Sequence, residues 1–130
     1  MEITLDKLEA NKACGQGLFW FSERFPEGAE HTEIISRLEE EKTTTDWIEW
    51  LLKEFKLSGI ARSWHPNGQL AYEWSYENGE LHGESRDWYP NGQLKYEWVY
   101  ENGEVHGIQR GWHPNGKLGY EQTYNHGFLI

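Results

Sequence analysis

Six histidines are the residues of this chain best suited to metal binding or proton transfer, because imidazole titrates near neutral pH and ligates metal ions. Their spacing argues against a metal site. In the strand arrangement derived below, His82 and His106 lie two strands apart, at about 10 Å. His65 and His113 lie four strands apart, at roughly 19 Å. Metal–nitrogen bonds are about 2.0–2.1 Å long, so neither pair can share an ion. We expect no metal site and no cofactor.

Asp87, Cys14 and the glycine-rich turns are the other groups that could take part in chemistry. Asp87 stands where the other copies of a sequence repeat have Ser63 and Gly111. It has no base, nucleophile or oxyanion donor at a definable distance, so we expect a solvated strand residue. Cys14 is expected to be a buried apolar residue of a helix. The glycine-rich turns lack the sequence context of phosphate-binding loops. The sequence predicts a protein that is not an enzyme.

Asp87 and the glycine-rich turns lie in a repeat of 24 residues, which occurs three times, in residues 59–82, 83–106 and 107–130. Each copy has two turns, one like Pro66-Asn67-Gly68 and one like Asn78-Gly79, although the last turn of the third copy is degraded. Asn-Gly favours the type I′ turn of β-hairpins, and polar and apolar residues alternate between the turns. We predict a single-layer antiparallel β-meander of about six to seven strands.

The register of the strands follows from the turns. If Asn67-Gly68 is a two-residue loop, Arg62 lies opposite Glu73. The same rule gives two further pairs of opposite charge, Arg86 with Glu97 and Arg110 with Glu121. Applied to the Asn-Gly turns, it places an aromatic ring across a glycine twice, Trp74 across Gly83 and Trp98 across Gly107. These glycines are therefore interpreted as structural.

Aromatic residues fall on both faces of the predicted sheet. One face carries Leu70, Tyr72, Trp74, Tyr76, Leu94, Tyr96, Trp98, Tyr100, Leu118, Tyr120 and Tyr124, and the other carries Trp64, Trp88 and Trp112. The rings either pack against each other as the sheet's own core or leave an open surface suited to binding, since Tyr and Trp dominate interface hot spots. The residues predicted to bind a partner are Trp64, Trp88, Trp112, Tyr96, Trp98, Tyr100, Tyr120, Glu84, Glu101 and Glu104.

The first 58 residues contain no Asn-Gly and no alternation, and they are predicted to be helical. Thr4 caps a helix that runs to about Cys14, Thr32 caps residues 33–41, and residues 46–56 form an amphipathic helix. We expect these helices to cap the sheet at the edge strand 59–65 or on one face, because repeat arrays and edge strands need cover. The predicted fold class is α+β, with a helical cap (1–58) and three repeats (59–130).

Composition limits the partners of this chain of 130 residues, whose net charge is −10 and whose mean hydropathy is −0.86. An acidic surface repels nucleic acid and anionic membranes, so we expect neither to bind directly. A protein partner that is basic or binds nucleic acid is expected instead. The N-terminus lacks the features of a secretory signal and the single cysteine cannot form an internal disulfide, so we expect a cytoplasmic location.

The repeat pattern G-x-x-R-x-W-[HY]-P-N-G-x-L-x-Y-E-x-x-Y-x-N-G resembles the MORN repeat variant of bacterial toxin-antitoxin repeat antitoxin proteins. The resemblance covers residues 59–130. It implies a gently twisted, single-layer β-meander used for protein binding, and it supplies no catalytic residue. The N-terminal segment is similar to helical leaders of bacterial and phage repeat proteins.

Two functions therefore compete. The preferred one is a non-enzymatic inhibitor, antitoxin-like or immunity-like, that binds a protein through its aromatic, acidic surface. The alternative is a phage-encoded inhibitor of a host defence or nucleic-acid-handling complex, anti-CRISPR-like, whose charge mimics nucleic acid. High salt weakens both, but only the second predicts competition with DNA or RNA. The apolar end, Phe128-Leu129-Ile130, lies at an open edge that could pair with a second copy to give a homodimer.

Overall fold

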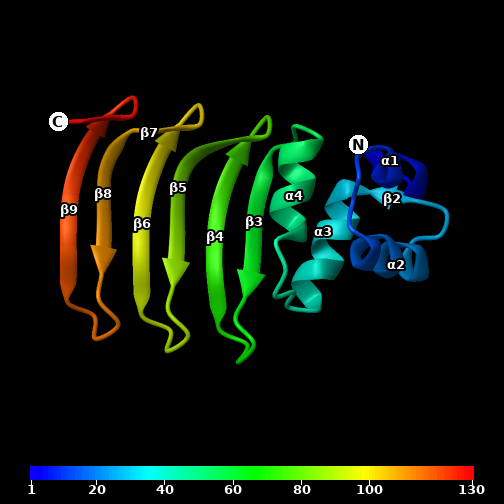
Figure 1. Ribbon diagram of the computed structural model, residues 1–130, viewed down its shortest axis with the longest axis horizontal. Coiled ribbons are helices and arrows are strands. Elements are labelled where there is room, and N and C mark those ends of the chain that lie inside the picture. Colours follow the sequence, from blue (N-terminus) through cyan, green and yellow to red (C-terminus); the bar gives the residue numbers. More distant parts are fainter. The chain divides into compact units, whose positions relative to one another are not determined.

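The computed structural model describes all 130 residues and divides into two compact units, Met1–Glu41 and Lys42–Ile130. Short helices come first and an antiparallel sheet follows, so the fold is α+β as predicted (Figure 1). The division differs from the boundary expected at residue 58, because the last helix packs on the first strand of the large sheet. None of the helices has both the length and the apolar character that crossing a bilayer requires.

The first unit contains three helices, α1 (Leu5–Ala10), α2 (Gly15–Arg24) and α3 (His31–Glu40), and a short antiparallel pair, β1 (Glu2–Ile3) and β2 (Ala29–Glu30). Apolar residues from all five elements are buried in its core: Ile3, Leu8, Phe21, Ala29, Ile34 and Leu38. The strands were not predicted, since two residues are too few to show alternation.

The helix ends of this unit confirm one prediction and correct others. Thr4 caps α1, and its Oγ1 accepts a hydrogen bond of 3.3 Å from the Lys7 backbone N–H. The helix stops at Ala10, so it does not reach Cys14. Cys14 is exposed rather than buried: its sulfur accepts a hydrogen bond of 3.3 Å from the Gly17 backbone N–H at the start of α2. The third helix begins at His31, before the predicted Thr32 cap.

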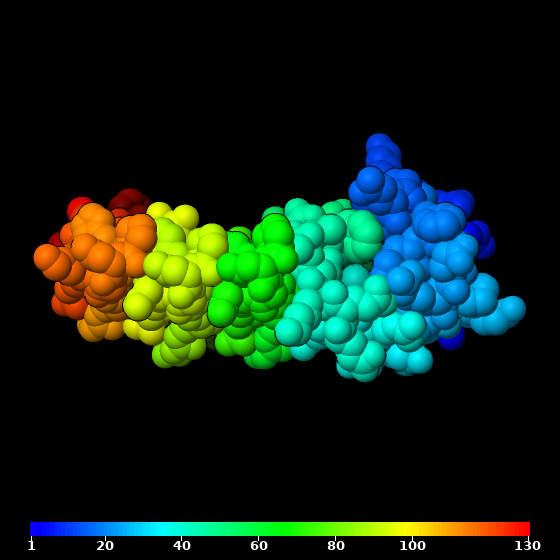
Figure 2. Space-filling view, turned by 90° about the horizontal axis from the view of Figure 1, so that it is seen from below, coloured from blue at the N-terminus to red at the C-terminus, as the bar shows by residue number.

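The second unit is helix α4 (Trp47–Glu54) with one antiparallel sheet of eight strands. Its strands are β3 (Gly59–Trp64), β4 (Leu70–Glu77), β5 (Glu80–Trp88), β6 (Leu94–Glu101), β7 (Glu104–Val105), β8 (Gly107–Trp112), β9 (Leu118–Asn125) and β10 (Phe128–Leu129). They pair in sequence order, with the short β7 also on β6, so the predicted meander is confirmed. Figure 2 shows the repeats following one another in the same order, from green through yellow to orange.

Charged pairs lie directly opposite each other at the predicted positions. Arg62 faces Glu73, Arg86 faces Glu97 and Arg110 faces Glu121. Each arginine Nε donates to the carboxylate across the hairpin, at 2.8, 3.2 and 2.7 Å in chain order. Glu97 also accepts from Arg110 Nη1 at 3.3 Å, so the second and third repeats are joined by the same row of charges.

The register across the second set of turns differs from the prediction. Trp74 pairs with Ser85 rather than with Gly83. Between the pair Trp74–Ser85 and the pair Tyr76–Leu81, β5 has two more residues than β4. The extra residues include Gly83, whose φ of 92° lies in the left-handed region that favours glycine. Gly83 instead faces Tyr100 on β6, and Gly107 faces Tyr124 on β9. A two-residue-turn rule assumes an unbroken ladder and misses this bulge.

Helix α4 covers the first strand of the sheet, where a helical cap was expected. Ile48 and Leu52 are fully buried, as is Ala61 on β3. The backbone carbonyl of Thr43 accepts a hydrogen bond of 2.9 Å from the Trp64 N–H, which closes that end of the edge strand. In Figure 1 the helix lies along β3. Helix α4 and the segment before it therefore cover the edge strand of the first repeat, which would otherwise be open to pairing with another chain.

Gln109 supplies hydrogen bonds where the ladder between β6 and β8 is interrupted. Its side chain is fully buried, its Oε1 accepts from the Val99 N–H at 2.9 Å, and its Nε2 donates to the Val99 carbonyl at 3.0 Å. We expect Gln109→Leu to lower the free energy of unfolding by about 1–3 kcal/mol, because the Val99 N–H is left without an acceptor. Chemical denaturation measures this. Gln122, directly opposite but exposed, is the matched control, and an equal loss in Gln122→Leu would refute the explanation.

Candidate functional site: an aromatic groove with one carboxylate

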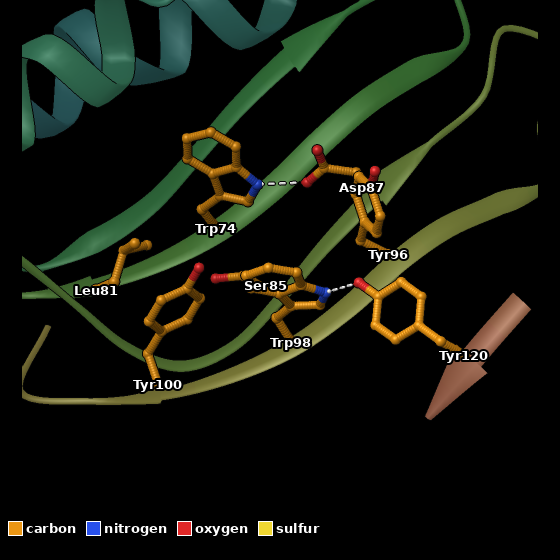
Figure 3. Close-up of a pocket in the computed structure, with 8 residues that line it drawn as sticks. All are labelled: Trp74, Leu81, Ser85, Asp87, Tyr96, Trp98, Tyr100 and Tyr120. Carbon is orange, nitrogen blue, oxygen red and sulfur yellow. Dashed lines mark hydrogen bonds between the residues drawn. The ribbon is translucent and has the colours of Figure 1, made fainter. Parts of the chain in front are cut away.

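The aromatic face of the repeats contains a hollow of about 330 Å³ (Figure 3). Its walls are five aromatic side chains: Trp74, Tyr96, Trp98, Tyr100 and Tyr120. Leu81, Ser85 and Asp87, all from β5, complete the lining. We call this hollow the aromatic groove. The five rings are half-buried, so each still presents part of its surface to solvent.

Strand pairing explains why these residues meet. Ser85 lies between Trp74 on β4 and Trp98 on β6, directly opposite both. Asp87 lies in the same way between Tyr72 and Tyr96. Directly opposite residues of antiparallel strands share a face of the sheet. The central strand β5 therefore supplies the small and acidic residues of the groove, while its neighbours supply the rings.

Both indole N–H groups of the groove are held by the following hairpin. Trp74 Nε1 donates to Asp87 Oδ1 at 2.6 Å, and Trp98 Nε1 donates to the Tyr120 hydroxyl at 2.9 Å (Figure 3). The acceptors differ because Gly111 replaces Asp87 in the third repeat. A Cβ at Gly111 would lie 2.2 Å from Tyr120 Cε1, so only glycine lets that ring lie there. The Tyr120 hydroxyl then takes the place of the missing carboxylate.

Burial raises the pKa of three titratable side chains that line the groove. It raises the pKa of Asp87 above its ordinary value, and the Trp74 hydrogen bond and the charge of Lys95 partly oppose the rise. Burial also raises the pKa of the Tyr100 and Tyr120 hydroxyls, so both stay protonated at neutral pH. The buried Ser85 Oγ has no hydrogen-bond partner. The groove therefore offers one carboxylate and several hydroxyl groups among aromatic rings.

A second, wider hollow of about 440 Å³ lies beside the Asn-Gly turns. Glu49 and Lys53 of α4, Trp74 and Tyr76 of β4, and Glu80 and Glu104 are among its lining residues. The Tyr76 hydroxyl donates to Glu49 Oε1 at 3.2 Å, and burial raises the pKa of Glu49. Trp74 and Leu81 line both hollows, so the two are neighbours on one face.

The structure gathers four of the predicted binding residues in the aromatic groove: Tyr96, Trp98, Tyr100 and Tyr120. Glu104 lines the second hollow, whereas Glu84 pairs with Arg86 and Glu101 with His106. Trp64, Trp88 and Trp112 are half-buried and do not line the groove. The Trp88 and Trp112 carbonyls accept hydrogen bonds from His65 and Tyr89 side chains, which tie neighbouring repeats together.

Sequence reasoning missed Trp74, Leu81 and Ser85 as members of the site and assigned Asp87 the wrong environment. Asp87 is half-buried and accepts a hydrogen bond from the indole of Trp74, so it is not a solvated strand residue. One signal was available: Asp87 is the acidic member of three equivalent positions, beside Ser63 and Gly111, on a face made of rings.

Histidines do converge at one place, contrary to the spacing argument. Ligand atoms of Glu101, His106 and His126 all lie within 4.8 Å of one another. The last turn of the third repeat contains His126, which replaces the asparagine at the position of Asn78 and Asn102 and lies next to His106. His106 Nδ1 faces the His126 backbone N–H at 3.1 Å, and its Nε2 lies 3.4 Å from Glu101. His82 makes the same contacts with the next turn and with Glu77, so the arrangement is explained as a brace of the repeat.

A single-layer meander built from three like units, with aromatic side chains half-exposed on one face, defines this chain as a repeat protein. Residues 57–78, 81–102 and 105–126 match the model of the MORN repeat variant and together span half of the chain. The chain belongs to the MORN repeat variant family, which confirms the resemblance drawn from the repeat pattern and makes it a protein-binding repeat module. Residues 1–56 match a second family model, the YdhT N-terminal domain. No curated protein and no solved structure matches the chain.

Proposed function

We propose that this chain is a non-enzymatic inhibitor, antitoxin-like or immunity-like and cytoplasmic, that binds a protein partner through the aromatic face of its repeats. The observation that carries the proposal is the aromatic groove. Five half-buried rings surround a hollow in which Asp87 is the one ionisable carboxylate. Large rings that can be desolvated at little entropic cost are what binding hot spots are made of.

Charge supports a basic partner, or one that binds nucleic acid. The net charge is −10, and the exposed glutamates Glu80 and Glu104 lie beside the Asn78-Gly79 and Asn102-Gly103 turns and line the second hollow, next to the groove. Acidic groups around an interface steer an approaching basic protein and raise its association rate, and salt screens the effect. Binding is therefore expected to be salt-sensitive.

Affinity capture tests the proposal. The tagged full chain and a Trp98→Ala, Tyr100→Ala variant are used to capture partners from cell lysate at low and high salt, with circular dichroism as the check on folding. We expect one stoichiometric protein that is lost at high salt and in the variant. A Trp88→Ala, Trp112→Ala variant examines the predicted stripe on the opposite face. Capture that the Trp98→Ala, Tyr100→Ala variant does not weaken, or no partner at either salt, would refute the proposal.

Adding duplex DNA or RNA to the captured complex separates the two forms of the hypothesis. An inhibitor that mimics nucleic acid occupies the partner's nucleic-acid site, so the competitor should release it. An antitoxin-like inhibitor that binds elsewhere should stay bound at the same ionic strength. Matching the ionic strength is essential, because added polyanion also screens charge.

The C-terminal edge stays a candidate for self-association. Only two residues, Phe128 and Leu129, pair with the outer edge of β9, and their side chains are exposed, as is Ile130. A homodimer through this edge would cover these side chains and extend the meander. Sedimentation velocity over a range of concentrations measures it, and Phe128→Asp should then reduce the dimer fraction. A sedimentation coefficient that does not change with concentration would contradict the homodimer.

A further inference from the structure

We propose that the aromatic groove receives an arginine side chain of the protein partner, with the guanidinium stacked on the Trp and Tyr rings and paired with Asp87. The inference rests on the proposed function and names the chemistry that the groove recognises.

The groove has no free side-chain N–H group to offer an anion. Among its lining residues only Trp74 and Trp98 carry a side-chain N–H, and both donate within the protein. Acceptors, in contrast, remain. Trp74 occupies Oδ1 of Asp87, and no hydrogen bond or ion pair of the structure engages Oδ2. The Ser85 Oγ is buried without a partner, and hydroxyl lone pairs accept readily. The hydroxyl groups of the lining can donate or accept, but the free carboxylate oxygen of Asp87 can only accept while it is ionised, so the charged end of the groove is matched to a ligand that donates.

The walls favour a flat cation. The faces of aromatic rings attract cations electrostatically, and a guanidinium can stack on a ring while it donates in its own plane to a carboxylate. Asp87 supplies the carboxylate, and no basic residue lines the groove. Lys95 lies nearby but outside the lining. Its ammonium is 5.2 Å from the centroid of the Tyr96 ring and 5.5 Å from that of Tyr89, which shows that rings of this sheet do attract a cation.

Asp87 is half-buried, so its carboxylate is favoured by a countercharge. Burial raises its pKa because a carboxylate without a nearby countercharge is costly away from water. A guanidinium bound in the groove supplies that countercharge and stabilises the ionised form. The other groups near Asp87 are the Tyr72 and Tyr96 rings on the paired strands, Lys95 on β6, and Glu49 on α4. Of these only Lys95 is basic, and it forms no ion pair with Asp87.

The test is a titration of the isotope-labelled full chain with N-acetyl-arginine amide, followed by NMR at the indole N–H signals of Trp74 and Trp98. N-acetyl-citrulline amide, which has nearly the same shape without the charge, is the matched ligand. We expect both signals to shift and saturate with arginine, and citrulline to bind at least tenfold more weakly. Equal binding of the two ligands, equal binding of N-acetyl-lysine amide, or shifts confined to other tryptophans would overturn the inference.

The variant Asp87→Asn keeps an oxygen that can accept from Trp74, removes the negative charge, and replaces the free oxygen of Asp87 with an NH2 group that donates. Arginine affinity is expected to fall at least tenfold in it. Glu54→Gln removes one charge from an exposed position on α4 and should leave affinity within twofold. The citrulline comparison needs no substitution, so the inference is testable even if Asp87→Asn does not fold. If partner capture depends on the groove but arginine does not bind, the inference fails and the proposed function stands. If arginine binds but capture does not depend on the groove, the proposed function fails, and only the preference of the groove for a guanidinium stands.

Discussion

Truncation of Leu52 to alanine is expected to lower the free energy of unfolding of the second unit by about 2–5 kcal/mol. Leu52 lies on α4, is fully buried, and faces the first strand of the sheet. A Cβ placed on Gly59 would lie 3.5 Å from Leu52 Cδ2, so the side chain packs directly on the β3 backbone. Removing it leaves a cavity that neither the helix nor the strand can fill without moving.

Denaturant titration followed by tryptophan fluorescence measures this loss. Every tryptophan except Trp20 belongs to the second unit, so the signal reports mainly on that unit. Leu129→Ala is the control, because the Leu129 side chain is 60% exposed at the other end of the sheet. A loss in Leu52→Ala no larger than in Leu129→Ala would show that α4 does not stabilise the sheet.

The second large effect is expected for Gly79→Ala, at about 2–4 kcal/mol, from a left-handed backbone conformation and from a clash. Gly79 has a φ of 82° in the Asn78-Gly79 turn. A Cβ there would lie 2.8 Å from Lys56 Cα and 3.3 Å from the Lys53 carbonyl, at the end of α4. The Gly79 N–H also donates to the Leu57 carbonyl at 3.0 Å, so moving the turn away loses that bond.

Gly103 provides a closely matched control for this substitution. It occupies the same position of the next repeat with a φ of 83°, but a Cβ there would meet only Glu80 side-chain atoms, at 3.9 Å. Gly103→Ala should therefore cost only the conformational part, about 1–2 kcal/mol. Thermal or chemical denaturation of both variants gives the difference. Equal losses would mean that contact between the turn and α4 contributes nothing.

The sheet was predictable because its signals are local and repeated. Asn-Gly turns and the row of Arg–Glu pairs predict the strand order and the register around those pairs, and the structure confirms both. Closer to the Pro-Asn-Gly turns the register shifts by one residue, so that Trp64, Trp88 and Trp112 lie opposite Leu70, Leu94 and Leu118, which a two-residue loop does not predict. The register across the second turns was not predictable by counting, since the extra residues around Gly83 and Gly107 disturb the ladder without changing which side faces the core. Because β5 has an even number of extra residues there, the alternation of side chains between the two faces continues across these turns. The aromatic rings named on one face therefore do lie on that face.

The site was predictable only in part. Four rings of the aromatic groove were named from alternation, but alternation gives a face and not a place on it. Asp87 was misjudged because its environment depends on Tyr72 and Tyr96, which lie on two different neighbouring strands. Cys14 was misjudged because helix α1 ends four residues earlier, and helix ends are set by capping contacts more than by composition.

The claim that the aromatic face of the repeats binds a protein partner is tested most directly by oxidative footprinting of the captured complex. Mass spectrometry compares the oxidation of each tryptophan and tyrosine in the free chain and in the complex. The account predicts strong protection of Trp74, Trp98 and Tyr100, with Trp20 of the first unit unchanged as the internal reference. Groove residues that oxidise as fast in the complex as in the free chain, with protection elsewhere, would contradict it.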